Sequence, residues 1–221
     1  MRAIMELINP YNFSLLKSVD NKLVDDSGTV FPKIRGVIRI VDGSNYTDNF
    51  GFQWNKFQKT QIDREKKDCL ISKIRFFAET NWDPLSLKNQ NLLEVGCGAG
   101  RFSQVVLSNT KANLYSIDFS SAVEANYRNN KEYKNRIQIF QASIYEMPFE
   151  NNSFNKVFCL GVLQHTPNFK QSIKSLADNL KANKGSIVLF STVAVKQGFP
   201  NHAIVSSAKG AVEGLTLALA A

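Results

Sequence analysis

A short apolar strand that runs into three alternating glycines and then a helix constrains the fold of this chain more than any other stretch. The strand is predicted over 91–95, and Gly96, Gly98 and Gly100 lead from it into a helix predicted over 100–109. Glycine allows a sharp backbone turn, and it lets a ligand lie against bare peptide at the N-terminus of the helix. The junction therefore predicts a ligand-binding loop at the carboxyl end of a buried strand.

An acid follows the next strand along the chain. This strand is predicted over 113–117, and Asp118 comes directly after it. A carboxylate at this place can accept hydrogen bonds from both hydroxyls of a ribose. The loop and the acid together predict a site for an adenosine-containing ligand at the switch point of an α/β sheet.

From residue 91 onward the chain alternates between strands and helices. Strands are predicted over 91–95, 113–117, 137–141, 154–160 and 186–190. Helices are predicted over 100–109, 120–130 and 168–181. This order predicts an α/β fold with a Rossmann-like, doubly wound, mostly parallel sheet and helices on both faces.

The spacing of the glycines separates two nucleotide-binding patterns. The dinucleotide fingerprint places a glycine where this chain has Arg101. The G-x-G-x-G pattern found here, with Glu94 two positions before the first glycine, instead resembles the class I S-adenosylmethionine-dependent methyltransferases, in particular the type-11 group. The resemblance covers 92–181 and includes the segments 141–149, 153–158 and 161–166.

The resemblance implies S-adenosyl-L-methionine as the cofactor and assigns residues to it. The three glycines would hold the methionine part, Glu94 would orient the loop and Asp118 would hold the ribose. Phe119 would flank the adenine, and Ser143 with Ile144 would meet the edge of that ring. Because the family usually has an acid at the position of Ser143, we expect weakened affinity for the cofactor.

His165 is the candidate catalytic residue, as a base. The loop after the fourth strand of the core lies at the carboxyl edge of the sheet, where ligands bind. Methyl transfer from a sulfonium depends mainly on the alignment of donor and acceptor, so a base is optional. The alternative interpretation of His165 is a capping or packing residue before Thr166 and Pro167.

Residues 1–58 are expected to form a small β-rich N-terminal module of short strands and loops. A hairpin is predicted over 22–31 and a further strand over 36–41. The module resembles the zinc-ribbon-like start of a subgroup of these methyltransferases, but residues 9–12 read Asn-Pro-Tyr-Asn where the subgroup has a C-P-x-C knuckle. Without thiols, we expect no metal site.

Residues 59–90 are expected to form a helix and a linker, with the helix over 60–80. The aromatic run before it consists of Phe50, Phe52, Trp54 and Phe57. Most of it is interpreted as core that joins the module to the main domain, and the alternative is that it caps the cofactor or lines an acceptor pocket. The candidate residues of the acceptor pocket are Tyr46, Trp54 and Gln61.

Residues 91–185 are assigned as the methyltransferase core, and 186–221 as a fifth strand and a terminal helix that resemble the short-chain dehydrogenase/reductase family. Lys209 matches the lysine of that family, but Val205 stands at the position of its tyrosine and Thr192 at that of its serine. Without the phenol, dehydrogenase activity is not expected. We expect the class I fold to be C-terminally incomplete, so that the fifth strand is an open edge at which copies of the chain can associate.

Composition restricts the partners and the compartment. The 221 residues include 27 Lys and Arg against 19 Asp and Glu, for a net charge of +8. This charge favours anionic partners, but the basic residues are spread along the chain, so a small-molecule partner is expected and an RNA acceptor is the minority alternative. The apolar stretches are too short to span a membrane, and the N-terminus has no signal-peptide pattern. The three cysteines are scattered, which indicates a reducing compartment. The chain is therefore predicted to be soluble and cytoplasmic, without membrane contact.

These observations predict an S-adenosylmethionine-dependent methyltransferase that acts on a small-molecule acceptor. One alternative is a non-catalytic protein that binds an adenosine ligand or acts as a scaffold. A weaker alternative is an NAD(P)-dependent oxidoreductase, against which Arg101 and Val205 argue.

Overall fold

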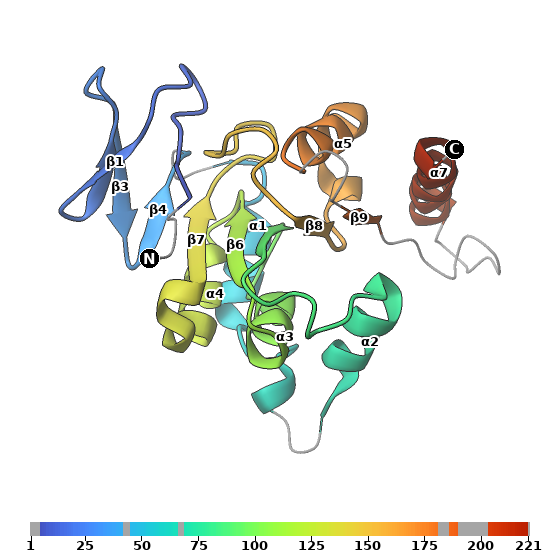
Figure 1. Ribbon diagram of the computed structural model, residues 1–221. Coiled ribbons are helices and arrows are strands. Elements are labelled where there is room, and N and C mark those ends of the chain that lie inside the picture. Colours follow the sequence, from blue (N-terminus) through green and yellow to red (C-terminus); the bar gives the residue numbers. More distant parts are fainter. Residues whose placement is uncertain (1–4, 42–44, 66–68, 181–185, 190–202, 221) are drawn as a thin grey trace.

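The computed structural model describes residues 5–41, 45–65, 69–180, 186–189 and 203–220. Within them the chain forms a nine-stranded sheet in the order β1-β2-β3-β4-β7-β6-β5-β8-β9 (Figure 1). The strands are β1 (Lys17–Val19), β2 (Lys22–Val24), β3 (Val30–Ile34), β4 (Val37–Arg39), β5 (Asn91–Val95), β6 (Asn113–Asp118), β7 (Ile137–Gln141), β8 (Lys156–Cys159) and β9 (Ser186–Leu189). The α-helices are α1 (Asp48–Lys56), α2 (Ile71–Thr80), α3 (Arg101–Asn109), α4 (Val123–Asn130), α5 (Phe169–Asp178) and α7 (Ala203–Ala220). Short 3₁₀ turns are η1 (Asp63–Glu65), η2 (Lys131–Arg136) and η3 (Leu163–His165).

Two kinds of strand pairing meet at β4. β1 to β4 form an antiparallel meander, and β4 then pairs in parallel with β7, with Arg39 opposite Gln141. The pairings from β7 to β9 are also parallel. The predicted fold class, a mostly parallel α/β sheet with a β-rich N-terminal part, is therefore confirmed. The order β7-β6-β5-β8-β9 puts the switch point between β5 and β8, where ligands bind in such sheets.

The central strands send alternate side chains to opposite faces of the sheet, as the two-residue period of a strand requires. Leu92 and Leu114 pack with Phe76 in one apolar cluster, to which α2 and α3 contribute. Leu93 and Tyr115 belong to the cluster on the other face, to which α5 contributes. This sandwich holds the carboxyl ends of the strands in fixed positions for the site.

Helix α1 corrects the expectation of strands and loops throughout residues 1–58. Phe50, Phe52 and Trp54 stand at alternate positions, a spacing that imitates a strand although the backbone is helical. Phe52 and Phe57 are 69% and 51% exposed. The interpretation of the aromatic run as joining core is therefore wrong for these two residues.

The predicted helix over 60–80 begins later than expected, at Ile71. The Asp63 carboxylate accepts hydrogen bonds from the Ser72 and Lys73 backbone N–H groups, at 3.1 and 3.0 Å. Asp63 therefore satisfies two donors that have no partner inside the first turn of α2. The chain before it turns instead of continuing the helix.

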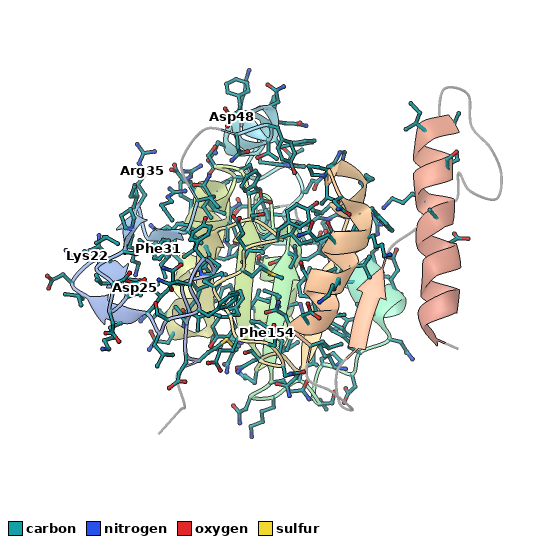
Figure 2. All side chains as sticks on the ribbon, turned by 90° about the horizontal axis from the view of Figure 1, so that it is seen from above. Lys22, Asp25, Phe31, Arg35, Asp48 and Phe154 are labelled. Carbon is teal, nitrogen blue, oxygen red and sulfur yellow. The ribbon has the colours of Figure 1, made fainter. Side chains whose placement is uncertain are left out.

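A hydrogen-bonded polar cluster occupies the place where the resembling subgroup has its metal knuckle. Asn9 and Asn12 both donate their Nδ2 groups to Asp25 Oδ2, at 2.7 and 3.0 Å. Ser27 Oγ donates to Asp25 Oδ1 at 2.7 Å, and this bond is the main reason that the pKa of Asp25 lies well below its usual range. Because N–H groups face the carboxylate, this donor set does not suit a cation. Figure 2 shows Asp25 and Phe31 among the N-terminal strands, on the opposite side of the molecule from α7.

β9 is the last strand in the described part of the sheet, beside β8. Self-association at this edge stays a prediction. Thr192, at the position of the dehydrogenase serine, lies outside the described residues. Lys209, at the position of the dehydrogenase lysine, lies on α7 and is 8% exposed. Among the helices of the described residues, none has the length and apolar character that a bilayer crossing requires.

Candidate functional site

A cavity of about 500 Å³ lies at the carboxyl ends of β5, β6 and β8. Residues of the loops after these strands form one wall, and residues of α1 form another. Most of the residues predicted from the sequence line it: Tyr46, Trp54, Gln61, Gly96, Gly98, Asp118, Phe119, Ser143, Ile144 and His165. The described lining does not include Glu94 or Gly100. A volume of this size suits a nucleoside-sized ligand with a small second molecule.

Gly98 presents bare peptide to the cavity. Its backbone N–H donates to Asp118 Oδ2 at 2.8 Å, which ties the loop after β5 to the end of β6. Its φ is +49°, and a Cβ placed there would lie 3.6 Å from Trp54 Nε1. A methyl group there would be in van der Waals contact with the Trp54 indole, so this side chain lies close to the glycine loop at the cavity.

Gly100 is required for packing and does not contact the cavity. Its φ is +84°, and a Cβ there would lie 2.3 Å from Asn126 Oδ1 and 2.4 Å from Asn130 Nδ2. The close approach lets the start of α3 pack directly on α4. This packing gives Gly100 a role in the contact between α3 and α4, and its role in binding the cofactor stays a prediction.

Glu94 points into the protein and not into the cavity. Its carboxylate accepts hydrogen bonds from Ser103 Oγ on α3 and from Ser116 Oγ on β6, the latter at 2.7 Å. Burial raises the pKa of Glu94 to about 7. Ser103 in turn accepts from Asn126 Nδ2 at 2.9 Å. Glu94 therefore supports the loop from beneath, as part of a polar network that joins α3, α4 and β6.

Asp118 is held in one orientation by its neighbours. Its Oδ1 accepts from Ser120 N–H at 2.9 Å and from Ser120 Oγ at 2.6 Å. Burial raises the pKa of Asp118, and the Ser120 hydrogen bonds oppose this effect. The two Ser120 bonds use both lone pairs of Oδ1, whereas Oδ2 accepts only from Gly98 and keeps a further lone pair for a ribose hydroxyl. The ring of Phe119, beside it, lies 5.5 Å from that of Tyr46.

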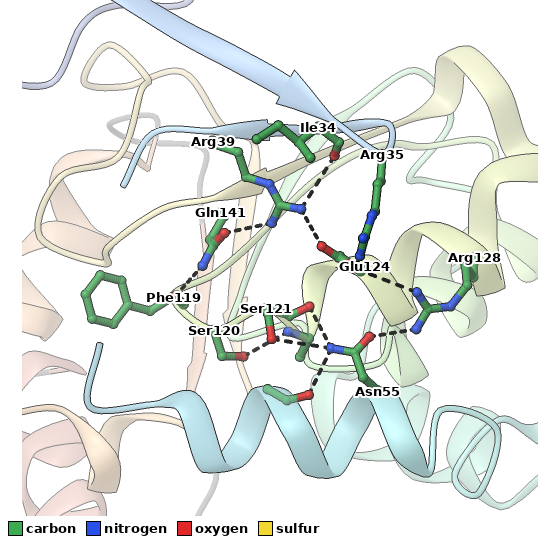
Figure 3. Close-up of polar contacts among 12 residues, drawn as sticks. Ile34, Arg35, Arg39, Asn55, Phe119, Ser120, Ser121, Glu124, Arg128 and Gln141 are labelled. Carbon is green, nitrogen blue, oxygen red and sulfur yellow. Dashed lines mark hydrogen bonds and ion pairs between the residues drawn. The ribbon is translucent and has the colours of Figure 1, made fainter. Parts of the chain in front are cut away.

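Helix α1 is attached to the start of α4 by polar contacts (Figure 3). Asn55 Nδ2 donates to the Ser121 carbonyl at 2.9 Å, and Arg128 Nη2 donates to Asn55 Oδ1 at 2.6 Å. A Cβ at Gly51 would lie 2.4 Å from Ser121 Oγ, so the two elements touch. These contacts set the position of Trp54, on the same helix, above the glycine loop.

Ser143 and Ile144 lie in a tight turn after β7. Ser143 Oγ accepts the Tyr145 backbone N–H at 3.1 Å, and the Ser143 carbonyl accepts that of Glu146 at 3.1 Å. The hydroxyl proton of Ser143 can still be donated to a ligand. Both residues line the cavity on the side of Phe119, where the resemblance puts the adenine.

His165 lines the cavity and contacts α1. The centroid of its ring lies 5.0 Å from that of Phe50. Gln164 Nε2 lies 3.3 Å from His165 Nε2, and since an amide nitrogen only donates, this contact favours the tautomer whose Nε2 accepts the bond and whose Nδ1 carries the proton. Burial, with a smaller effect of the Lys209 charge, lowers the pKa of His165. The ring is therefore neutral at pH 7.

Several cavity residues were missed by the sequence analysis. They are Gln53, Gln58, Arg75 and Arg101. Arg101 directly follows the third glycine, a position that could have indicated it. Arg75 belongs to no motif and reaches the cavity only because α2 packs on α3.

The sheet order, the glycine loop and the acid at the end of β6 define the class I methyltransferase fold. Residues 93–189 match the family model described as "Methyltransferase domain". The match to a methyltransferase domain implies S-adenosylmethionine as the cofactor.

Two curated relatives and one solved structure are similar to this chain. The tRNA U34 carboxymethyltransferase of Nautilia profundicola is 27% identical over 113 residues, which are 51% of this chain and 37% of that protein. The ubiquinone biosynthesis O-methyltransferase of Rickettsia canadensis is 32% identical over 103 residues, 46% of this chain and 42% of that protein. A Methanococcus maripaludis protein assigned as an S-adenosyl-L-methionine-dependent methyltransferase has the same fold, with a TM-score of 0.53, 16% identity and 66% coverage of each chain.

The chain thus spans less than half the length of these two curated relatives. One of these names refers to tRNA U34 and the other to ubiquinone biosynthesis. The acceptor of this chain is therefore not decided by similarity.

Proposed function

We propose that the chain transfers the methyl group of S-adenosylmethionine to a small-molecule acceptor bound in the same cavity. The observation that supports this most is the single cavity that joins Gly98 and Asp118 on one side to His165 on the other. The first two residues suit the cofactor, and the third can receive a proton from an acceptor. One space of about 500 Å³ therefore has room and chemistry for both reactants.

The cofactor supplies an activated methyl carbon on a sulfonium, whose bond electrons stay on sulfur when the acceptor attacks. Asp118 would hold the ribose through Oδ2, and Gly98 would let the chain approach the methionine part closely. Trp54 and Phe50 on α1 would exclude water above the reacting atoms. After the Gln164 amide releases its hydrogen bond, His165 Nε2 would take the proton that the acceptor loses, and the proton would later pass to water.

Calorimetric titration of S-adenosylmethionine tests the proposed cofactor site. Asp118→Ala should weaken binding by about 10- to 100-fold, because charge-assisted hydrogen bonds to the ribose are lost. Asp26→Ala is the matched control, since Asp26 is an exposed aspartate that pairs with Lys17 in the N-terminal strands. No binding by the folded, unsubstituted chain would overturn the proposal, and binding without transfer to any acceptor would favour the non-catalytic alternative.

An RNA acceptor is the second candidate, supported by the net charge of +8 and by the relative named as a tRNA U34 carboxymethyltransferase. Contacts to RNA phosphates release counterions, so such binding falls steeply with salt. Binding of bulk tRNA at 50 and 200 mM salt separates the candidates. An affinity that falls by ~100-fold or more would favour RNA.

A further inference from the structure

The backbone carbonyl of Phe119 is held by side chains from two separate parts of the chain. Gln141 Nε2, at the end of β7, donates to this carbonyl at 3.1 Å (Figure 3), and Asn45 Nδ2, ahead of α1, donates to it at 2.9 Å. Gln141 is only 3% exposed, and a buried amide is costly unless both of its ends have partners. The Gln141 amide therefore indicates a requirement on the position of the Phe119 carbonyl.

The direction of the Gln141 amide is set by Arg39 of β4. Arg39 Nη1 donates to Gln141 Oε1 at 2.7 Å, and Arg39 Nη2 donates to Glu124 Oε1 at 2.8 Å. The Arg39 side chain is 10% exposed. Because a guanidinium only donates, the amide oxygen faces Arg39 and the amide nitrogen is turned toward the Phe119 carbonyl. The hydrogen bonds therefore run in one direction, from β4 to the loop after β6.

The peptide group that carries this carbonyl also contacts Asp118. Its N–H belongs to Ser120 and donates to Asp118 Oδ1 at 2.9 Å. A peptide group is planar and rigid, so a shift of the Phe119 carbonyl must move the Ser120 N–H with it. The orientation of the Asp118 carboxylate therefore depends on the Gln141 amide, which holds the opposite end of the same peptide group.

We propose that Arg39 and Gln141 are positioning residues for the cofactor. They orient the carboxylate of Asp118 for the ribose, through the peptide group that follows Phe119. This inference rests on the proposed function, because it concerns the same cofactor site. It gives β4 a part in the recognition of the ribose, although the cavity lining includes no described residue of β1 to β4.

The pairing of β4 with β7 does not account for this arrangement. The backbones already join the two strands, since the Ile40 N–H donates to the Gln141 carbonyl at 2.9 Å. A side-chain contact that only strengthened this join would end at the bond between Arg39 and Gln141. The second bond of the amide, to Phe119, lies outside the strand pairing and holds a residue that lines the cavity.

Gln141→Glu tests the proposal because it changes the end of the side chain that faces Phe119. A carboxylate still accepts from Arg39, but it cannot donate to the Phe119 carbonyl, and the two oxygens repel each other. The fold should therefore be kept while the carbonyl moves, and thermal unfolding checks the fold. Gln138→Glu is the matched control, since Gln138 lies on the same strand but does not line the cavity.

Calorimetric titrations of adenosine and 2′,3′-dideoxyadenosine measure the effect on the ribose. The two ligands differ only in the ribose hydroxyls, so the ratio of their affinities isolates the contact with Asp118. The parent should prefer adenosine by about 10-fold, and Gln141→Glu should bring the ratio close to one. Arg39→Leu should lower the ratio as well, and it decides the proposal if Gln141→Glu does not fold. Arg35→Leu removes another partner of Glu124 and should leave the ratio unchanged. An equal loss of both ligands would indicate a merely structural role and would overturn the proposal.

Amide hydrogen exchange in the ligand-free chain tests the positioning without a cofactor. The Gly98 and Ser120 N–H groups both donate to Asp118. Gln141→Glu should make both amides exchange about 10-fold faster, and Gln138→Glu should leave both unchanged. Unchanged exchange in Gln141→Glu would overturn the proposal. If the parent binds neither adenosine nor S-adenosylmethionine, the proposed function fails, and the exchange rates still decide the role of Gln141.

Discussion

Gly98 and Gly100 share a positive φ, but their surroundings predict different effects of alanine. At position 100 the added Cβ meets Asn126 Oδ1 at 2.3 Å, so we expect the free energy of unfolding to fall by about 2–4 kcal/mol. At position 98 only the backbone penalty of about 1–2 kcal/mol applies. Gly98→Ala should instead weaken S-adenosylmethionine binding, because its methyl group enters the space beneath Trp54. Denaturant unfolding and calorimetry measure both effects, and equal destabilisation by the two substitutions would contradict this account.

Glu94 makes the stability of the chain depend on pH. Its pKa is about 7 when folded and about 4.3 when unfolded. Between these values the folded state retains a proton that the unfolded state has lost. The free energy of unfolding should therefore fall as the pH rises through this window, by on the order of 3 kcal/mol.

Denaturant unfolding at pH 5 and pH 8 measures this effect in the parent and in Glu94→Gln. The glutamine variant should lack this part of the pH dependence, because it has no proton to lose. Identical pH profiles of the two proteins would show that Glu94 is not the group responsible.

At the scale of elements, the position of α1 depends on a few side chains that face α4. Asn55→Ala removes the bonds to the Ser121 carbonyl and to Arg128, so α1 should be held less firmly over the cavity. We expect S-adenosylmethionine to dissociate about 10-fold faster, while the free energy of unfolding changes by only about 1–2 kcal/mol. Stopped-flow fluorescence measures the rate. Lys56→Ala, at the exposed end of the same helix, should leave it unchanged.

The stability of the N-terminal strands β1 to β4 should depend on Asp25. The zinc-ribbon-like modules that these strands resemble depend on their metal ion in the same way. Hydrogen bonds from Ser27 and from the Asn9 and Asn12 amides hold the pKa of Asp25 well below its usual range, so its stabilising effect is present above about pH 4 and is lost below it. Asp25→Ala should lower the melting temperature at pH 7 and have less effect at pH 3. Asp26→Ala is the control. Equal effects of Asp25→Ala at both pH values would contradict the assignment.

Elements whose residues follow a regular period are predictable from the sequence, and elements set by distant contacts are not. The strand of Leu92 and Leu93 and the glycine loop follow from local pattern, and so do the cavity positions of Asp118 and His165. The helical state of α1 does not, because its alternating aromatics imitate a strand and its contacts come from α4. Arg75 was missed for the same reason, since only the packing of α2 on α3 brings it to the cavity.

At the scale of the whole molecule, the N-terminal strands are part of the main sheet. β4 pairs with β7, and Leu23 and Phe31 share one apolar cluster with Tyr115 of the central strand β6. A chain that lacks residues 1–41 would expose this cluster and the edge of β7. We expect it to aggregate, or to lose both its cooperative thermal transition and its cofactor binding. A truncated chain that melts like the parent and binds S-adenosylmethionine would contradict this expectation.

The pairing of β4 with β7 also sets an order of events during synthesis. Arg39 and Gln141, whose side chains form a hydrogen bond, are 102 residues apart. At ~5–20 residues per second, a ribosome needs about 5–20 s to add that length. Throughout this interval the parallel edge of β4 has no strand to pair with. A ribosome that pauses before Gln141 thus holds a nascent chain with an unpaired edge, which is a template for pairing with another chain.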